Sequence, residues 1–278
     1  MKIMGETNKE PNVDKACHMD GRLSEFNFLA DKLDEYQKGL SDYLETKRRA
    51  FPRFYFISDD ELLSILGSSD PRAVQEHMLK MFDNRAQPNF EGDSTVMEGV
   101  SSAESELMVF VQTVAPEGLA VEKWLNEVLR VKKKTLIAIL KEATYYYPKM
   151  IRCEWIEKYL GQMAMTGSKI WWTYQVEDGF RKVKAGKQTA IKDLATKLTG
   201  QLNDLVAEMD KPLAKNYSKK CNTMIIGDVH ARDVVDRFVR DSVMDPREVN
   251  WESQLRMYWE KSVDNCIIRQ CTGEFDTG

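Results

Sequence analysis

The sequence predicts a mainly α protein, in which helices pack on helices and one small β-hairpin is inserted between them. Two observations favour this class. Several long segments repeat apolar residues at intervals of three or four, which is the period of an amphipathic helix. Between Asn84 and Pro116 this period disappears, and β-branched residues gather in a single island. Proline and glycine separate the segments, so the expected core lies between helices.

The longest expected helix in the first part of the chain covers residues 21–50, where charged residues alternate with a regular apolar stripe. This helix should end before Pro52, because a proline disfavours the helical conformation in the residue that precedes it. The aromatic run Phe51–Ile57 follows, and its composition favours a β conformation.

Two short helices should come next. Ser58 and Glu61 have the spacing of a capping box, which predicts a helix that reaches about Leu66. Pro71 suits the first position of another short helix, because its missing N–H would be unpaired there in any case. Asp70 can cap this second helix, which should reach about Phe82.

The β-branched island predicts a hairpin. Residues 95–100 and 106–114 form its two strands, and Ser101–Ser105 form the turn. This is the only clear sheet signal in the sequence. The helical period then returns in five segments that are separated by Pro148, Gly167, Gly186, Pro212 and Gly227. The expected helices cover residues 119–146, 151–165, 168–183, 190–209 and 230–243. We therefore expect a first helical subdomain (1–83), an insertion (84–116) and a second helical subdomain (117–278).

Composition excludes several classes of function. The charges are intermingled and sum to −4, so no basic stripe attracts nucleic acid, which is not an expected partner. The five cysteines are odd in number and include no Cys-x-x-Cys pair, which favours a reducing compartment. No apolar run approaches the roughly 18 residues of a membrane span, so we expect a cytoplasmic protein that has no membrane partner. The first residues resemble the middle of a chain, which predicts a fragment of a longer protein.

One segment imitates a metal site. Gly227-Asp228-Val229-His230 follows two isoleucines, and metallophosphatases present their first two metal ligands in this way. A two-metal site needs further histidine, asparagine and aspartate ligands downstream, and no histidine follows His230. We favour a structural turn in which Asp228 caps a helix that starts near His230. A metallophosphatase-like hydrolase is the minor alternative.

Other patterns lack a required group. Residues 186–189 (Gly-Lys-Gln-Thr) resemble the end of a nucleotide-binding loop, but Arg181 stands where its first glycine belongs. Neither Cys17 with His18 nor Cys266 with Cys271 has the spacing and third group of a metal or nucleophilic site. We therefore expect no catalytic, cofactor-binding or metal residues. Six tryptophans predict packing between helices: Trp124, Trp155, Trp171, Trp172, Trp251 and Trp259.

Four motifs follow one another along the chain. Residues 43–63 contain the run Lys-Arg-Arg-Ala-Phe-Pro-Arg-Phe, which residues 70–75 continue; residues 168–173, 228–235 and 251–259 hold the other three. In this order they resemble the carboxy-terminal half of the linker of dynein heavy chains, and the resemblance covers essentially the whole chain. The residues on which it rests are Phe51, Pro52, Arg53, Phe54, Trp171, Trp172, Asp228, His230, Arg232, Asp233, Trp251, Gln254, Arg256 and Trp259.

The resemblance implies a mechanical role. In that family the linker is an elongated, curved stack of helical bundles that spans a ring of AAA+ modules, and the second helical subdomain leads to the first module. ATP and Mg act in the modules of the parent motor, so the resemblance implies no cofactor and no enzyme activity in this fragment. The implied partners are the AAA+ ring of the same heavy chain and, through the rest of the motor, the microtubule and the dynein intermediate and light chains.

The resemblance also implies a location and a contact. Residues 54–70 and 269–273 are most similar to axonemal chains, with an inner-arm type favoured, which implies the cytoskeleton of a cilium or flagellum axoneme. The family's linker hairpin touches a ring module, so the hairpin here implies the same contact. The candidate side chains for it are Val96, Met97, Val109, Phe110 and Val111. A generic helical scaffold or adaptor stays open as the alternative function.

Overall fold

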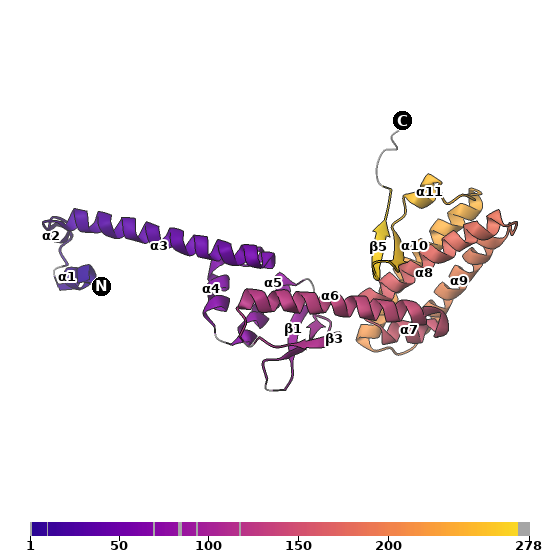
Figure 1. Ribbon diagram of the computed structural model, residues 1–278, viewed down its shortest axis with the longest axis horizontal. Coiled ribbons are helices and arrows are strands. Elements are labelled where there is room, and N and C mark those ends of the chain that lie inside the picture. The colour runs from indigo at the N-terminus through magenta and orange to yellow at the C-terminus, as the bar shows by residue number, and fades with distance from the viewer. Residues whose placement is uncertain are drawn as a thin grey trace, which may run out of the picture. The chain divides into compact units, whose positions relative to one another are not determined.

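The computed structural model describes residues 2–9, 11–68, 70–82, 85–92, 94–116 and 118–271. Helices dominate these residues, and two small antiparallel sheets accompany them (Figure 1), which confirms the mainly α class. Contacts divide the chain into two compact units. The first consists of Met1–Asp83 with Pro116–Asn126, and the second of Asn84–Ala115 with Glu127–Gly278. None of the described helices combines the length and apolar character needed to cross a lipid bilayer.

The first unit is formed by helices that include the long one predicted at residues 21–50. Its elements, with η for a 3-10 helix, are α1 (Lys2–Lys9), α2 (Val13–Cys17), α3 (Arg22–Ala50), η1 (Pro52–Phe56), α4 (Asp59–Gly67), η2 (Pro71–His77), α5 (Met78–Met81) and the start of α6 (Val121–Tyr146). The Ser58 and Glu61 capping box is present at the start of α4, and Asp70 accepts a hydrogen bond from the Arg72 amide, as predicted. Lys47 of α3 pairs with Glu122 of α6 at 2.7 Å.

The β conformation expected for Phe51–Ile57 is wrong for Pro52–Phe56, which form the 3-10 helix η1, whereas Phe51 and Ile57 at its two ends are extended. Phe51 and Phe54 are both fully buried, with their rings 5.0 Å apart, and Phe51 also packs on Phe82. A tight 3-10 turn brings two aromatic residues three positions apart onto the same side of the chain, which an extended strand cannot do. Burial of both rings therefore outweighs their β propensity.

The predicted hairpin is present but belongs to a larger sheet. Strands β1 (Arg85–Phe90), β2 (Met97–Ser102) and β3 (Leu107–Val114) form an antiparallel sheet in the order β1-β2-β3. The sequence did not predict β1, which contains Pro88 and lies at an edge, where a missing N–H is tolerated. Gly99 of β2 lies so close to β3 that an added Cβ would be 2.4 Å from the Met108 carbonyl oxygen.

The second unit contains most of the helices, and two predicted breaks inside them are wrong. The remaining helices are η3 (Tyr147–Lys149), α7 (Arg152–Lys158), α8 (Gly161–Lys184), α9 (Ala190–Met209), α10 (Lys215–Arg240) and α11 (Val249–Glu252). α8 continues through Gly167, where an added Cβ would lie 3.1 Å from the Trp155 ring. α10 runs through Gly227 instead of starting near His230. Both glycines are tolerated because tertiary packing overrides their weak helix propensity.

A second hairpin, formed by β4 (Arg256–Glu260) and β5 (Asn265–Arg269), was not predicted as such. It packs on α8, where the Met257 amide donates to Thr173 Oγ1 at 3.3 Å and the Tyr258 hydroxyl donates to Glu177 at 2.6 Å. The sequence expectation of a single sheet signal is therefore corrected, because these strands alternate too little in hydrophobicity to be recognised without their helix.

The core of the second unit lies between α8, α9 and α10, which Figure 1 shows as neighbours. Aromatic rings fill its centre, and Trp251 contacts Trp172, Phe180 and Phe238 at centroid distances of 5.1, 6.2 and 6.0 Å. Four of the six tryptophans are buried as expected, and Trp171 and Trp259 are partly exposed.

Candidate functional site

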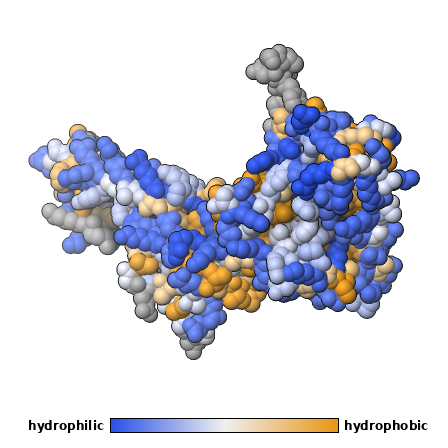
Figure 2. All heavy atoms as spheres, turned by 45° about the vertical axis from the view of Figure 1, so that its right-hand side comes forward, coloured by the Kyte–Doolittle hydropathy of each residue, from blue (hydrophilic) through white to orange (hydrophobic). Residues whose placement is uncertain are grey.

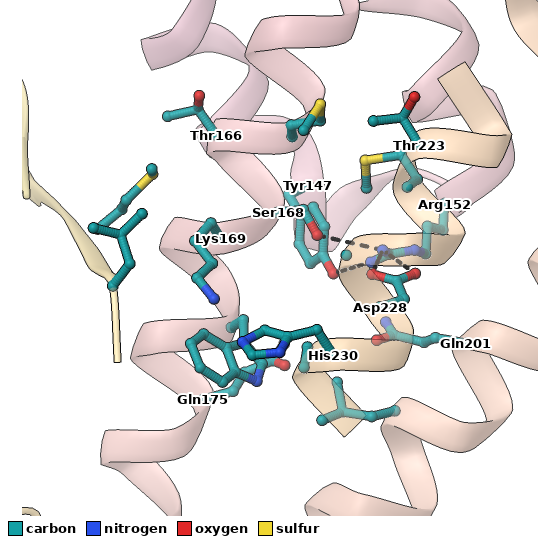
Figure 3. A pocket seen from close by; sticks show the side chains of 18 of the residues that line it. Tyr147, Arg152, Thr166, Ser168, Lys169, Gln175, Gln201, Thr223, Asp228 and His230 are labelled. Atoms are coloured by element: carbon teal, nitrogen blue, oxygen red, sulfur yellow. Dashed lines mark hydrogen bonds and ion pairs between the residues drawn. The ribbon is translucent and has the colours of Figure 1, made fainter. Parts of the chain in front are cut away.

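The best-organised polar cluster among the described residues joins the middle of α10 to the start of α7. Arg152 Nη2 lies 2.6 Å from both carboxylate oxygens of Asp228. The same guanidinium donates to the Tyr147 hydroxyl through Nη1 at 2.5 Å and to Ser168 Oγ at 3.3 Å (Figure 3). The side chains of Arg152 and Asp228 are only 13% and 15% exposed. Burial raises the pKa of Asp228, and the guanidinium opposes that rise.

Aromatic rings support this ion pair. The Tyr147 ring stacks on Trp171 at 5.6 Å and meets Trp155 edge-on at 4.9 Å. The two indole N–H groups donate to the last turns of α6, Trp155 to the Ala143 carbonyl and Trp171 to the Thr144 carbonyl, each at 2.8 Å. One network thus connects the end of α6, the start of α7, the first half of α8 and the middle of α10. Networks of this kind favour a single packing arrangement.

This network lines one end of a cavity of about 280 Å³ that α8, α9, α10 and the segment around β4 enclose. Figure 3 shows Lys169 of α8 and His230 of α10 on the same side of this cavity, away from the ion pair. Lys169 Nζ lies 3.7 Å from the centre of the Trp172 ring. Burial lowers the pKa of Lys169 to about 8.

The structure corrects the expected role of Asp228. It does not cap a helix that starts near His230, because α10 begins thirteen residues before it and Asp228 pairs with Arg152 across the bundle. The metallophosphatase alternative also requires a strand before Gly227, and residues 225–226 are helical instead. Among the described residues, no group of three histidine, cysteine, aspartate or glutamate side chains is placed to hold a metal ion.

The three-stranded sheet presents an exposed apolar face along β3. Leu107, Val109 and Val111 alternate along β3 and are 48%, 61% and 50% exposed, while Met108 and Phe110 point inward. Figure 2 shows apolar residues grouped in the region of this sheet, among mostly hydrophilic surroundings. Because these side chains are exposed on one face of β3, the row is available to a partner.

The five predicted ring-contact candidates are therefore divided. Val109 and Val111 are exposed, Val96 is partly exposed, and Met97 and Phe110 are buried at 1% and 7%. Leu107, which sequence reasoning missed, shares the exposed face. Its alternation with Val109 and Val111 is the signal that identifies it.

The hairpin turn is fastened to the helices of the second unit. Glu106 follows this turn, and its Oε1 accepts from the Gly161 amide at the start of α8 and from Lys220 Nζ of α10, both at 2.9 Å. A carboxylate at a helix start also interacts favourably with the exposed amides there. The sheet is held by two helices at one end. Along the outer edge of β3, the Val111 amide donates to Thr135 Oγ1 of α6 at 3.1 Å, so the exposed part is the face that carries Leu107, Val109 and Val111.

The remaining motif residues have structural contacts. Pro52 opens η1, and Arg53 donates to the Met81 carbonyl at 2.6 Å while its guanidinium lies over the Phe82 ring. Arg232 pairs with Asp233 on the surface of α10 at 2.6 Å. The other members lie in or beside the core of the second unit: Trp171, Trp172, Trp251, Gln254, Arg256 and Trp259.

Sequence reasoning missed three residues of the cavity region: Tyr147, Arg152 and Lys169. Tyr147 and Arg152 lie outside the motifs, and Lys169 lies in the motif at residues 168–173, where the two tryptophans drew attention instead. Asp228, the partner of Arg152, lies 76 positions further along the chain. No local pattern predicts such a pairing.

The fold and these contacts define a mainly helical protein with two small antiparallel sheets among its described residues. A family model described as "Dynein heavy chain, N-terminal region 2" matches residues 1–143, so the chain belongs to the dynein heavy chain family. Over its full length it is 47% identical to dynein axonemal heavy chain 10 of Homo sapiens. It is 51% identical to the dynein-1-alpha heavy chain, flagellar inner arm I1 complex, of Chlamydomonas reinhardtii, again over the full chain. The chain spans about 6% of the length of each relative.

Proposed function

We propose that this chain is a segment of the linker of an axonemal dynein heavy chain, a lever that carries conformational changes of an ATP-driven AAA+ ring to movement along a microtubule. The proposal is supported by the similarity of the whole chain to axonemal relatives. One of these relatives is described as a flagellar inner arm chain, which favours an inner-arm type and a location in a cilium or flagellum axoneme.

In this proposal the segment itself is mechanical. ATP and Mg act in the AAA+ modules of the parent chain, and microtubules and intermediate or light chains are reached through other parts of the motor. Residues 84–116 form the insertion between the two helical subdomains, 1–83 and 117–278. Close packing between helices suits a lever, because well-packed interiors resist deformation and transmit displacement.

The observation that carries the proposal is the combination of an exposed apolar face on β3 with the anchoring of the same sheet at Glu106. We assign Val109 and Val111, with Leu107 beside them, to the contact with a ring module. A force applied to this face of β3 is transmitted to α8 and α10 through the Glu106 hydrogen bonds. The sheet therefore couples the contact with the ring to the helical bundle.

The test uses the whole motor that carries this segment. Val109→Asp together with Val111→Asp places two charges in the proposed contact and should slow microtubule gliding while ATP turnover continues. Val206→Asp is the matched control, because Val206 is an exposed valine at 47% on α9, away from the sheet. Gliding at normal speed in the double variant, or an equal loss in the control, would contradict the proposed contact.

A further inference from the structure

Lys169 is unusual among the lysines of this chain. Its side chain is partly buried, yet among the described residues no carboxylate pairs with its ammonium group. Its contact with the Trp172 ring offsets part of the cost of removing the charge from water. A buried ammonium without an anion is unfavourable, so its retention beside a cavity suggests that an anion comes from outside.

The cavity wall around Lys169 combines apolar and polar side chains. Part of the lining consists of apolar side chains from α8, α9, α10 and the segment around β4: Met165, Leu198, Met224, Ala231, Leu255 and Met257. Polar side chains that can donate or accept hydrogen bonds interrupt them, among them Gln175 and Gln201 (Figure 3). A ligand that fits such a wall has an apolar body and one anionic group. The apolar body then contacts the apolar side chains, and the anionic group contacts the Lys169 ammonium.

We propose that this cavity binds an acidic segment of a protein, with a glutamate or aspartate carboxylate placed against Lys169 and a neighbouring apolar side chain placed against the methionine and leucine wall. The volume of about 280 Å³ holds one or two side chains, not a folded element. This inference does not depend on the lever role, since it rests on the residues of this chain that line the cavity.

A phosphate group fits this site less well than a carboxylate. Phosphate sites typically use the fork of an arginine or the amides of a helix start. The one guanidinium that lines the cavity, that of Arg152, has both terminal nitrogens committed to Tyr147, Ser168 and Asp228. The charge of Arg152 is paired with Asp228, whereas none of the described carboxylates pairs with Lys169, whose single ammonium matches the single charge of a carboxylate.

The experiment is isothermal titration calorimetry of the 278-residue chain with three probes: a blocked Leu-Glu-Leu peptide, the matching Leu-Gln-Leu peptide and inorganic phosphate. We expect the glutamate peptide to bind and the glutamine peptide to bind on the order of tenfold more weakly. Lys169→Met keeps the approximate length of the side chain and removes its charge, and it should lower the affinity for the glutamate peptide by a similar factor. Lys197→Met is the control, because Lys197 lies exposed on α9 and does not line the cavity. Circular dichroism and thermal melting establish that both variants fold.

The pH dependence of affinity provides an independent check. Because the pKa of Lys169 is lowered to about 8, the affinity for the glutamate peptide should fall as the pH rises above that value, whereas an ordinary lysine would hold its charge to about pH 10. The other titratable groups that line the cavity are Tyr147, Arg152, Asp228 and His230. Arg152 and Asp228 are paired with each other, and a His230→Gln variant separates the contribution of the histidine.

Three results would overturn the inference. They are the absence of binding by the glutamate peptide, equal binding of the glutamate and glutamine peptides, and unchanged affinity in Lys169→Met. Tighter binding of phosphate than of the glutamate peptide would replace a carboxylate site by a phosphate site and would also overturn it.

Discussion

The guanidinium of Arg152 and the carboxylate of Asp228 form a largely buried ion pair, in which one nitrogen lies 2.6 Å from both oxygens. Replacing Asp228 by alanine should lower the free energy of unfolding by about 3 kcal/mol, because it leaves a buried positive charge without its anion. Urea denaturation, followed by near-ultraviolet circular dichroism of the aromatic network, measures the loss. Asp236→Ala on the same helix is the control: Asp236 is 52% exposed, so we expect a change within about 0.5 kcal/mol. Equal effects of the two variants would show that the pair contributes nothing.

The close approach of β2 and β3 at Gly99 predicts a second effect. In Gly99→Ala the new methyl group would lie 2.4 Å from the Met108 carbonyl oxygen, so the strands must separate. We expect a loss of about 1–3 kcal/mol and faster hydrogen exchange in the sheet. Gly200→Ala in α9 meets open space and should stabilise the helix by up to about 1 kcal/mol. We therefore expect the two glycine-to-alanine substitutions to change the free energy of unfolding in opposite directions. A Gly99→Ala variant as stable as the parent would contradict the sheet register.

Burial of Lys169 predicts a dependence of stability on pH. Its pKa falls from the ordinary 10.5 to about 8 on folding, so between these values the unfolded chain binds more protons than the folded one. The free energy of unfolding should therefore rise from pH 8 toward pH 10, relative to Lys169→Met. The rise is less than about 1.4 kcal/mol per pH unit, since part of the side chain still reaches solvent.

The comparison with Lys169→Met removes the contributions of other groups whose titration changes stability in the opposite direction. Burial raises the pKa values of Cys153 and Cys221, and it raises that of Tyr258 to about 12, so these groups reduce stability as the pH rises. They are present in both proteins. Chemical denaturation at a series of pH values gives the difference, and parallel curves for the two proteins would contradict the burial of a charged lysine.

The apolar stripe of α3 predicts self-association of the isolated chain. Leu33 and Leu40 are 66% and 43% exposed, and exposed apolar surface of this kind favours contact with another surface. Leu33→Glu with Leu40→Glu should raise the monomer fraction in sedimentation experiments. Lys38→Glu, which changes an exposed charge on the same helix, should not raise it. A chain that is monomeric at high concentration before any substitution would refute the prediction.

Much of the fold could be predicted because the relevant signals are local. The helical period of residues 21–50, the capping box of Ser58 and Glu61 and the hairpin near residues 95–114 all involve neighbours in the sequence. Predictions failed where contacts with residues far away in the sequence determine the local structure. Gly167 looks like a helix break, but the ring of Trp155 needs the space that glycine leaves. Asp228 looks like a cap, but Arg152 provides a stronger partner in the middle of α10.

By itself, the sequence determined that this chain consists mainly of amphipathic helices, since an apolar period of 3.6 residues depends only on the geometry of one helix. It also identified the family, through motifs that can be read in order. Only the tertiary structure decided that Lys169 lies beside a cavity with none of the described carboxylates paired to it, and that Glu106 fastens the sheet to α8 and α10. The physical reason is that burial and charge pairing depend on which surfaces meet, and residues far apart in the chain supply those surfaces.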